Sequence, residues 1–247
     1  MSPDAAARQA RARLAALARP AGDFDASRYF RGAADLQFHN VGMAAVRRLA
    51  REIVEARRDD WTIEEAMACA EILIDDSVLE VKAVAVEIVA RFHREFAPRW
   101  LARWKAWLAT NRSANWATTD AICGVLIGPL LRRRPDLVPS VASWARHRNL
   151  WVRRAAAVSL VGLARRGQAL DAAYAVARAL HRDQADLIQK AVGWLLREAG
   201  KTDMARLERY LRAHGPTIPR TSVRYAIERF PPPRRRALLV ATKPASA

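Results

Sequence analysis

Cysteine is scarce in this sequence, with 2 residues in 247, and glycine (10) and proline (12) are also few. Two cysteines exclude a disulfide framework and a zinc site made of four cysteines. The low glycine and proline content excludes a collagen-like or linker-dominated chain. The longest uncharged apolar run, Ala121 to Leu131, is shorter than the roughly 20 residues that cross a bilayer. The N-terminus lacks the hydrophobic core of a secretory signal, so we expect a cytoplasmic protein with no membrane partner.

The usual signatures of catalytic and metal sites are also absent. The sequence contains no H-E-x-x-H, G-x-S-x-G, phosphate-loop or G-x-G-x-x-G pattern. Its five histidines, which lack the spacing of metal ligands, are His39, His93, His147, His181 and His214. Cys69 and Cys123 lie in apolar, helix-like stretches and are predicted to be buried, inert thiols. The sequence therefore predicts neither a metal nor a cofactor.

Helical periodicity runs through most of the chain. Apolar residues recur at steps of three and four over 78–92, 150–163 and 187–195. No stretch alternates apolar and polar residues with β-branched enrichment, so we expect an all-α protein. The predicted helix ends are a capping box at Thr62 and Glu65, N-caps at Asn149 and Asp183, and C-terminal glycines at Gly167 and Gly200.

Five helix-like segments share a pattern of an apolar residue, a charged residue and then a small or aromatic residue. Aligned on the charged residue, they are 38, 34, 36 and 34 residues apart. The charged residues are Lys82, Asp120, Arg154, Lys190 and Arg224. This period suits a right-handed α-solenoid of HEAT-like repeats, each made of two antiparallel helices. We expect the five side chains to form a column on its concave, basic face, with a ladder of solvated helix charges as the alternative.

Charge is distributed unevenly along the chain, whose net charge is +17. Residues 1–100 carry 15 Lys and Arg and 16 Asp and Glu, whereas residues 101–247 carry 27 and 9. A basic half beside a neutral half predicts a polyanionic partner, with nucleic acid as the first candidate and an anionic membrane as the second. A solubilising charged surface is the remaining alternative.

Tryptophan is concentrated in the basic half, where seven of the eight fall between residues 100 and 194. Trp100, Trp104 and Trp107 have the spacing of one buried helix face. Trp116 lies four residues before Asp120, and Trp194 lies four residues after Lys190, so each shares a helix face with a column residue. These two indoles are candidates for a binding groove; ordinary core packing of both, and a helix-dipole role for Asp120, are the alternatives.

Three segments resemble the AlkD-type DNA alkylation repair glycosylases. They are NWATTD at 115–120, NLWVRRAA at 149–156 and IQKAVGWLLRE at 188–198, and the residues at 200–202 and 218–221 fit the same family. The resemblance is strong over about 115–230 and thinner over 25–114. It implies a HEAT-like solenoid that grips duplex DNA in its concave face. It also implies hydrolysis of the N-glycosidic bond of N3- or N7-alkylated purines, with no metal and without flipping the base into a pocket.

The resemblance assigns roles to individual residues. Trp116 and Trp194 match the indoles that pack against the deoxyribose of the damaged nucleotide, and Asp120 matches the carboxylate beside the anomeric carbon. Ala117 is a departure, because related members often carry Asp there. The DNA-binding residues expected are Arg153, Arg154, Lys190, Arg197, Lys201, Arg220 and Arg224.

The predicted organisation is an N-terminal extension or helix over 1–24, a HEAT-like glycosylase domain over 25–240 and a flexible tail over 241–247. We expect a monomer that acts on double-stranded DNA with alkylated bases and associates with the nucleoid. Two other functions stay open: a non-catalytic HEAT-like protein that binds damaged or branched DNA, and a helical adaptor for an acidic protein.

Overall fold

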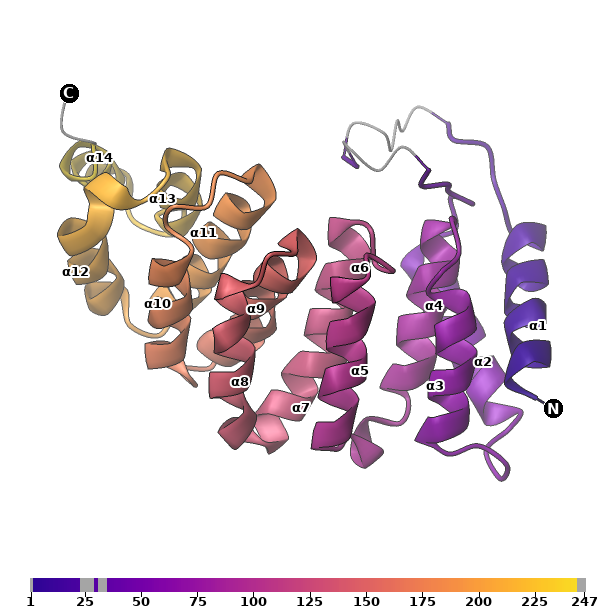
Figure 1. Ribbon diagram of the computed structural model, residues 1–247. Coiled ribbons are helices and arrows are strands. Elements are labelled where there is room, and N and C mark those ends of the chain that lie inside the picture. Colours follow the sequence, from indigo (N-terminus) through magenta and orange to yellow (C-terminus); the bar gives the residue numbers. More distant parts are fainter. Residues whose placement is uncertain (1, 23–28, 31–34, 244–247) are drawn as a thin grey trace. The chain divides into compact units, whose positions relative to one another are not determined.

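The computed structural model describes residues 2–22, 29–30 and 35–243, and these residues form helices and loops with no strand (Figure 1). Their single β-contact is an isolated bridge between Gln37 and Val78. The prediction of an all-α protein is confirmed for this part of the chain. The structure divides into an N-terminal unit, Met1–Leu130, and a C-terminal unit, Leu131–Ala247. Each unit is described by itself.

The N-terminal unit contains two layers of helices. In one layer α1 packs against α3, and in the other α4 packs against α2 and α6, while α3 and α4 join the layers. Ion pairs from Arg99 to Glu64 and from Arg103 to Glu71 tie α5 to α3. The helices are α1 (Pro3–Ala16), α2 (Met43–Glu55), α3 (Ile63–Leu73), α4 (Leu79–Ala90), η2 (His93–Glu95), α5 (Pro98–Ala109), α6 (Trp116–Ala121), η3 (Ile122–Ile127) and α7 (Gly128–Arg133), the last of which crosses the unit boundary.

Helix α5 supplies much of the core of this unit. Trp100, Trp104 and Trp107 are 2%, 0% and 1% exposed, which confirms their predicted packing on one buried face. Neither cysteine is exposed to solvent (0% for Cys69 and Cys123), as predicted, and no disulfide joins them. Burial raises the pKa of the Cys69 thiol to about 12.

The helix that begins at Trp116 changes its winding after Ala121. The segment η3 is a π-helix, and α6, η3 and α7 follow one another without a break in helical backbone. Pro129 has no backbone N–H and cannot donate to the carbonyl of Val125, so a wider turn before it accommodates the missing bond. π-Turns of this kind are frequent at functional sites.

The C-terminal unit also has two layers. Helix α11 packs between α9 and α13 in one layer, while α10 packs against α8 and also contacts α9 and α11. Helix α12 packs against α11 and α14. The helices are η4 (Pro135–Leu137), α8 (Val138–Ser143), η5 (Trp144–Arg146), α9 (Leu150–Ala164), α10 (Leu170–Ala179), α11 (Asp186–Gly200), α12 (Met204–His214), η6 (Gly215–Thr217), α13 (Arg220–Ala226) and α14 (Pro232–Ala241).

The predicted helix ends are partly right. The capping box of Thr62 and Glu65 and the N-cap Asn149 are confirmed, and Gly167 has the left-handed backbone (φ 73°) of a C-terminal glycine. The N-cap at Asp183 is wrong, because α11 begins at Asp186. The C-terminal glycine at Gly200 is also wrong. It is the last residue of α11, and a Cβ there would lie 2.4 Å from Cδ2 of Leu207.

The chain ends are held in the fold as far as the structure describes them. Helix α1, inside the predicted extension 1–24, packs against α2 and α3. Thr242, inside the predicted tail 241–247, is buried and accepts a hydrogen bond from Arg220, whereas residues 244–247 lie outside the described part. Among the described helices, none is long and apolar enough to cross a membrane.

Candidate active site

The five aligned charges lie at equivalent places in their helices. Each is the fourth or fifth residue of the second helix of a pair, on α4, α6, α9, α11 and α13. Helices α4 and α6 are neighbours in the N-terminal unit, and α9, α11 and α13 are neighbours in the C-terminal unit. The alignment therefore identified structurally equivalent positions, while the continuous column and the concave groove stay predictions.

Trp116 and Asp120 are the first and fifth residues of α6, so their side chains lie on one helix face. The start of α6 is fixed by Asn115, whose buried side chain accepts from the backbone N–H of Thr118 at 2.8 Å. The same side chain donates to the carbonyl of Ser113 (2.7 Å) and to Oγ1 of Thr118 (3.0 Å). This polar network fixes the start of α6, the helix that carries both candidate catalytic residues.

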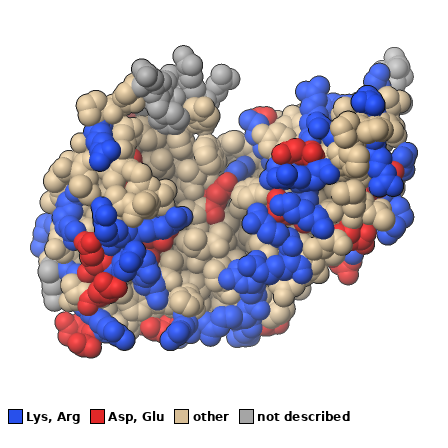
Figure 2. All heavy atoms as spheres, turned by 180° about the vertical axis from the view of Figure 1, so that it is seen from behind, with Lys and Arg blue, Asp and Glu red and all other residues tan. Residues whose placement is uncertain are grey.

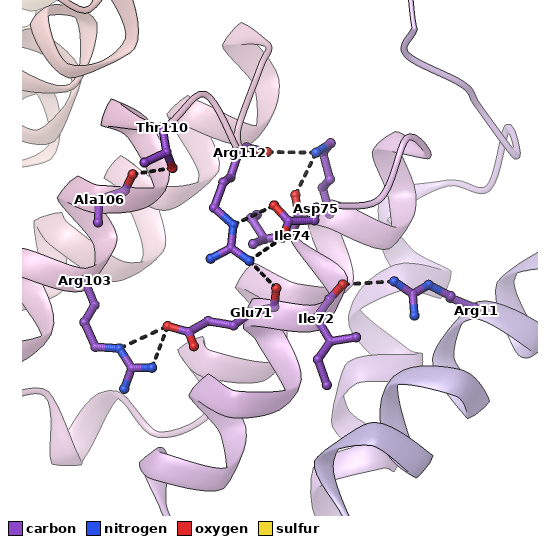
Figure 3. A network of polar contacts seen from close by, with 10 residues as sticks. Arg11, Glu71, Ile72, Ile74, Asp75, Arg103, Ala106, Thr110 and Arg112 are labelled. Atoms are coloured by element: carbon purple, nitrogen blue, oxygen red, sulfur yellow. Dashed lines mark hydrogen bonds and ion pairs between the residues drawn. The ribbon is translucent and has the colours of Figure 1, made fainter.

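The loop before α6 is anchored by Lys82 and by Arg112, and Figure 3 shows the contacts of Arg112. Nζ of Lys82 donates to the carbonyls of Ile74 (2.7 Å) and Arg112 (2.8 Å). Arg112 in turn forms an ion pair with Asp75 and donates to the carbonyl of Glu71 at 2.6 Å. The loop that leads into α6 and its candidate site residues is thereby joined to the C-terminal end of α3.

Lys82 is 5% exposed, and its predicted place in a surface column of charges is wrong. Its ammonium is used inside the protein, where it supplies donors to two carbonyls. Burial lowers the pKa of Lys82, and the nearby charges of Asp75 and Asp76 oppose that shift. The alignment identified the correct position in the helix. The carbonyls that accept hydrogen bonds from Lys82 come from other segments, so the repeat pattern does not indicate them.

Two residues of this loop have left-handed backbone, Asn111 (φ 61°) and Ala114 (φ 52°). Asparagine tolerates this conformation, whereas alanine is strained in it because its Cβ crowds the following carbonyl. Strained backbone persists only where the surroundings fix it, and it gathers at functional sites. The contacts of Lys82, Arg112 and Asn115 provide that constraint immediately before Trp116.

The indole of Trp116 is held from a distant part of the chain. Its Nε1 donates to the carbonyl of Tyr29 at 2.8 Å. The ring of Phe30 stacks on it, with centroids 5.1 Å apart and planes 9° apart, and Phe30 also contacts Phe38 at 5.3 Å. Tyr29 and Phe30 are site residues that the sequence reasoning missed, because no local pattern links them to a position 86 residues or more downstream.

In the C-terminal unit, Trp194 lies on α11, one residue after Gly193. A Cβ at Gly193 would lie 2.4 Å from Cβ of Tyr225 and 2.8 Å from the carbonyl oxygen of Ser222. Only glycine permits this approach, which brings α13 against α11 beside Trp194. Oγ of Ser222 strengthens the same crossing by donating to the carbonyl of Gln189 at 2.7 Å.

The predicted DNA-binding cations of α9 have partners inside the protein. Arg154 is 5% exposed, and its Nη1 donates to the carbonyl of Leu187 at the start of α11. Arg153 forms an ion pair with Asp183 (2.6 Å) and donates to the carbonyls of His147 and Arg148. Both arginines therefore connect α9 to the segment that begins α11.

The cations of α11 and of its C-cap are partly exposed and pair with three carboxylates. Lys190 is paired with Asp186 at 2.7 Å. Arg197 contacts Glu198 and Glu228, and Nζ of Lys201 lies 2.6 Å from Glu198. Burial alone would raise the pKa of Glu198, but hydrogen bonds from Lys201 and Arg165 outweigh it and hold the pKa below its usual value.

The two predicted cations of α13 differ in their surroundings. Arg220 donates to the carbonyls of Leu239 (3.1 Å) and Thr242 (3.2 Å) and to Oγ1 of Thr242 (2.9 Å), which fastens α14 to α13. Arg224 is exposed on the surface of the unit. Arg220 thus has an internal role in this structure, and Arg224 presents its charge to solvent.

The structure brings Trp116 and Asp120 together on α6, and Lys190, Trp194 and Arg197 together on α11. The convergence of these two groups stays a prediction. The C-terminal unit contains 24 Lys and Arg against 8 Asp and Glu, and on the face drawn in Figure 2 its cations outnumber its acids visibly. No group of three or more His, Cys, Asp or Glu side chains able to hold a metal ion occurs in the described ranges.

Comparisons with known proteins give the family. A predicted DNA alkylation repair enzyme from Enterococcus faecalis has a similar structure, with a TM-score of 0.73 and 18% sequence identity over 83% of this chain and 93% of that one. At this identity the match shows a shared fold. No curated protein matches the sequence. The model of the family described as DNA alkylation repair enzyme matches residues 10–230, which is most of the chain, and this protein therefore belongs to that family.

Proposed function

We propose that this protein is a monofunctional DNA glycosylase that excises N3- or N7-alkylated purines from duplex DNA. The observation that carries the proposal is the pairing of Trp116 and Asp120 on one face of α6, in a chain of the DNA alkylation repair family. Trp194, on α11, is the second indole of the proposed site. The protein acts as a cytoplasmic, nucleoid-associated monomer in this proposal.

The chemistry follows from the charge of the damaged base. A purine alkylated at N3 or N7 is cationic, so it leaves with the bonding electrons as a neutral base and needs no acid. Positive charge then grows on the sugar, and the carboxylate of Asp120 stabilises it electrostatically. Water adds to C1′, its proton passes to solvent, and Asp120 orients that water more than it transfers protons.

The indoles contribute in a related way. The face of an indole is the best aromatic partner for a cation, so Trp116 and Trp194 are each suited to stabilise positive charge on the sugar. Trp116 is already fixed in orientation by Tyr29 and Phe30, which reduces the ordering that substrate binding requires. Neither step requires the base to be flipped into a pocket or a metal to be bound.

One assay tests the proposal. Duplex DNA containing N7-methylguanine is incubated with the protein, and free base is measured against a reaction without protein. Release of N7-methylguanine with first-order kinetics is the expected result. No release above the uncatalysed rate would contradict the proposal.

A non-catalytic DNA-binding protein is the second candidate, and the stack of Phe30 on Trp116 favours it, because it covers one face of the indole. Ala117 also departs from the family pattern beside the proposed carboxylate. Tight, salt-dependent binding of damaged or branched DNA without base release would support this candidate.

A further inference from the structure

Helix α14 (Pro232–Ala241) begins after residue 230, where the match to the family ends. Three consecutive arginines, Arg234, Arg235 and Arg236, follow three prolines at its start, and all three arginines are exposed. The helix is therefore a strongly basic element added to the part of the chain that the family shares.

Helix α14 is seated firmly in the C-terminal unit. Arg220 donates three hydrogen bonds to its last turn and to Thr242. Gly215 lies so close to Thr242 that a Cβ on the glycine would be 2.4 Å from Cγ2 of the threonine. These contacts fix the position of α14 in the C-terminal unit, and with it the positions from which its arginines project.

The arginines of α14 lie near a cation already expected to bind DNA. Glu228 accepts a hydrogen bond from Arg197 of α11, and this bond is the largest cause of its lowered pKa. Arg229 follows Glu228 directly in the chain, and the charges of Arg229 and Arg235 lower the pKa of Glu228 further. Arg197 also contacts Glu198, so it is paired with two carboxylates, whereas Glu228 alone cannot balance the further charges of Arg229 and Arg235.

Arg234 lies 3.8 Å from Glu208 of α12 and helps to attach α14, whereas helix stability does not explain Arg235 and Arg236. The N-terminus of a helix is its positive end, where cations are disfavoured. The cations Arg132 and Arg133 in the last turn of α7 have the opposite, favourable placement. Pro232 and Pro233 also remove two of the backbone N–H groups of the first turn of α14, so its capacity to bind an anion comes mainly from side chains.

We propose that Arg229, Arg235 and Arg236, which we name the α14 patch, bind backbone phosphates of the DNA duplex that flanks the damaged nucleotide. Arginine suits this partner because its planar fork matches phosphate oxygens. Arg229 adjoins Arg197 of the proposed DNA-binding face, because it follows Glu228, which accepts a hydrogen bond from Arg197. Helix α14 thus lengthens the contact along the duplex. The inference rests on the proposed function for the identity of the polyanion.

The test measures binding of an undamaged duplex over a range of salt concentrations. Removing one arginine that binds a phosphate flattens the plot of log affinity against log salt by about 0.9. The double variant Arg235→Ala/Arg236→Ala should therefore flatten it by about two units and weaken binding at low salt. The matched control, Arg178→Ala/Arg209→Ala, removes the same charge from exposed positions on α10 and α12 and should leave the slope of the parent.

If the salt slope of the Arg235→Ala/Arg236→Ala variant equals that of the parent, the inference is overturned. Equal flattening in this variant and in the control would also overturn it, because net charge alone would then be responsible. A third result would also overturn it: the double variant binds phosphatidylserine vesicles more weakly than the parent does, but binds the duplex as the parent does. Because the duplex is undamaged, base release from N7-methylguanine DNA is a separate measurement. If the parent excises the base but the double variant keeps the parental slope, only the α14 patch is rejected. If the slope is flattened but the parent releases no base, only the glycosylase activity is rejected.

Discussion

Gly193 of α11 lies against Tyr225 of α13 so closely that a Cβ on the glycine would be 2.4 Å from Cβ of the tyrosine. The neighbouring atom on the other side is backbone, the carbonyl oxygen of Ser222 at 2.8 Å, and it has no rotamer by which to move away. The substitution Gly193→Ala should therefore push α13 from α11, destabilise the protein by about 1–3 kcal/mol and displace Trp194.

Urea denaturation of the variant checks this expectation, with Gly162→Ala as its control. Gly162 lies in the interior of α9, where an added Cβ would meet only a side-chain nitrogen of Arg166 at 3.8 Å. This control should gain roughly 0.5–1 kcal/mol, because alanine is the better helix former. Equal stability of the parent and Gly193→Ala would mean that the helices separate without cost.

Arg154 and Lys190 should respond differently to truncation, although both were predicted to bind DNA. Arg154→Ala removes the buried guanidinium that joins α9 to the carbonyl of Leu187, so a loss of about 1–3 kcal/mol in the free energy of unfolding is expected. Lys190→Ala removes a side chain that is 42% exposed and should instead flatten the salt slope of DNA binding by about one unit. Melting curves and binding titrations of both variants separate the two effects, and a stable Arg154→Ala protein with a flattened slope would reverse the assignment of Arg154.

Phe30 should support catalysis through the orientation of Trp116. An aromatic pair of this kind contributes about 0.5–1.5 kcal/mol beyond its buried area, so Phe30→Ala should slow excision by roughly 2–10-fold. Phe30→Tyr keeps the ring and should retain the parental rate. Single-turnover excision of N7-methylguanine measures both variants. Faster excision by Phe30→Ala would identify the stack as an obstacle to substrate.

Asp120→Asn tests the proposed catalytic carboxylate. The change keeps size and helix position but removes the negative charge, so excision should fall by about 10²–10³-fold, as when one electrostatic stabiliser is removed. Binding of undamaged DNA should be unchanged or slightly tighter. Asp136→Asn, at an exposed residue paired with Arg134, is the control and should leave excision unchanged. Excision by Asp120→Asn within a few-fold of the parent would remove Asp120 from the mechanism.

His181 should make folding sensitive to acid. Burial, with smaller contributions from His214 and Arg178, lowers its pKa to about 4. In the unfolded chain the imidazole binds a proton below about pH 6.5, whereas in the folded protein it stays neutral to about pH 4. The stability that neutral His181 supplies is therefore complete above pH 6.5 and is lost as the pH falls toward 4, with about 2 kcal/mol gone at pH 5.

The measurement compares urea denaturation at pH 7 and pH 5. His181→Gln still offers an oxygen to the hydroxyl group of Tyr210, which lies 2.6 Å from Nε2 of His181, but it cannot titrate. It should show less loss of stability on acidification than the parent does. His93→Gln, at an exposed position, should behave like the parent. An identical pH dependence in the parent and His181→Gln would mean that His181 is protonated in the folded protein.

The sequence was sufficient to predict the helical class, the packing of α5 and the equivalence of the five repeat positions, because each depends on periodicity within one or two helices. Trp116 and Asp120 lie on one helix face for the same reason. Contacts between segments that are distant in the chain could not be predicted from the sequence. Lys82 and Arg154 are buried because particular carbonyls just after α3, in the loop before α6 and in α11 accept their hydrogen bonds, and no local pattern indicates those carbonyls.

The errors at Asp183 and Gly200 have the same origin. Asp183 is used in an ion pair with Arg153, 30 residues earlier, and its other oxygen accepts from the backbone N–H of Ala185. Gly200 is selected by the approach of Leu207 rather than by a left-handed helix end. In both cases a contact with another helix, which no local pattern indicates, decides how the residue is used.

The burial of the two thiols has a consequence for a protein that works amid alkylation damage. Methylating agents that attack purine nitrogens also attack thiolates, which are far better nucleophiles than thiols. Cys69 and Cys123 have no solvent exposure, and the raised pKa of Cys69 keeps its sulfur protonated at neutral pH. These are the only cysteines in the chain, so the protein presents no accessible thiolate to the reagents that create its proposed substrate. The packing of α3 and η3, which buries Cys69 and Cys123, thereby protects both thiols from alkylation.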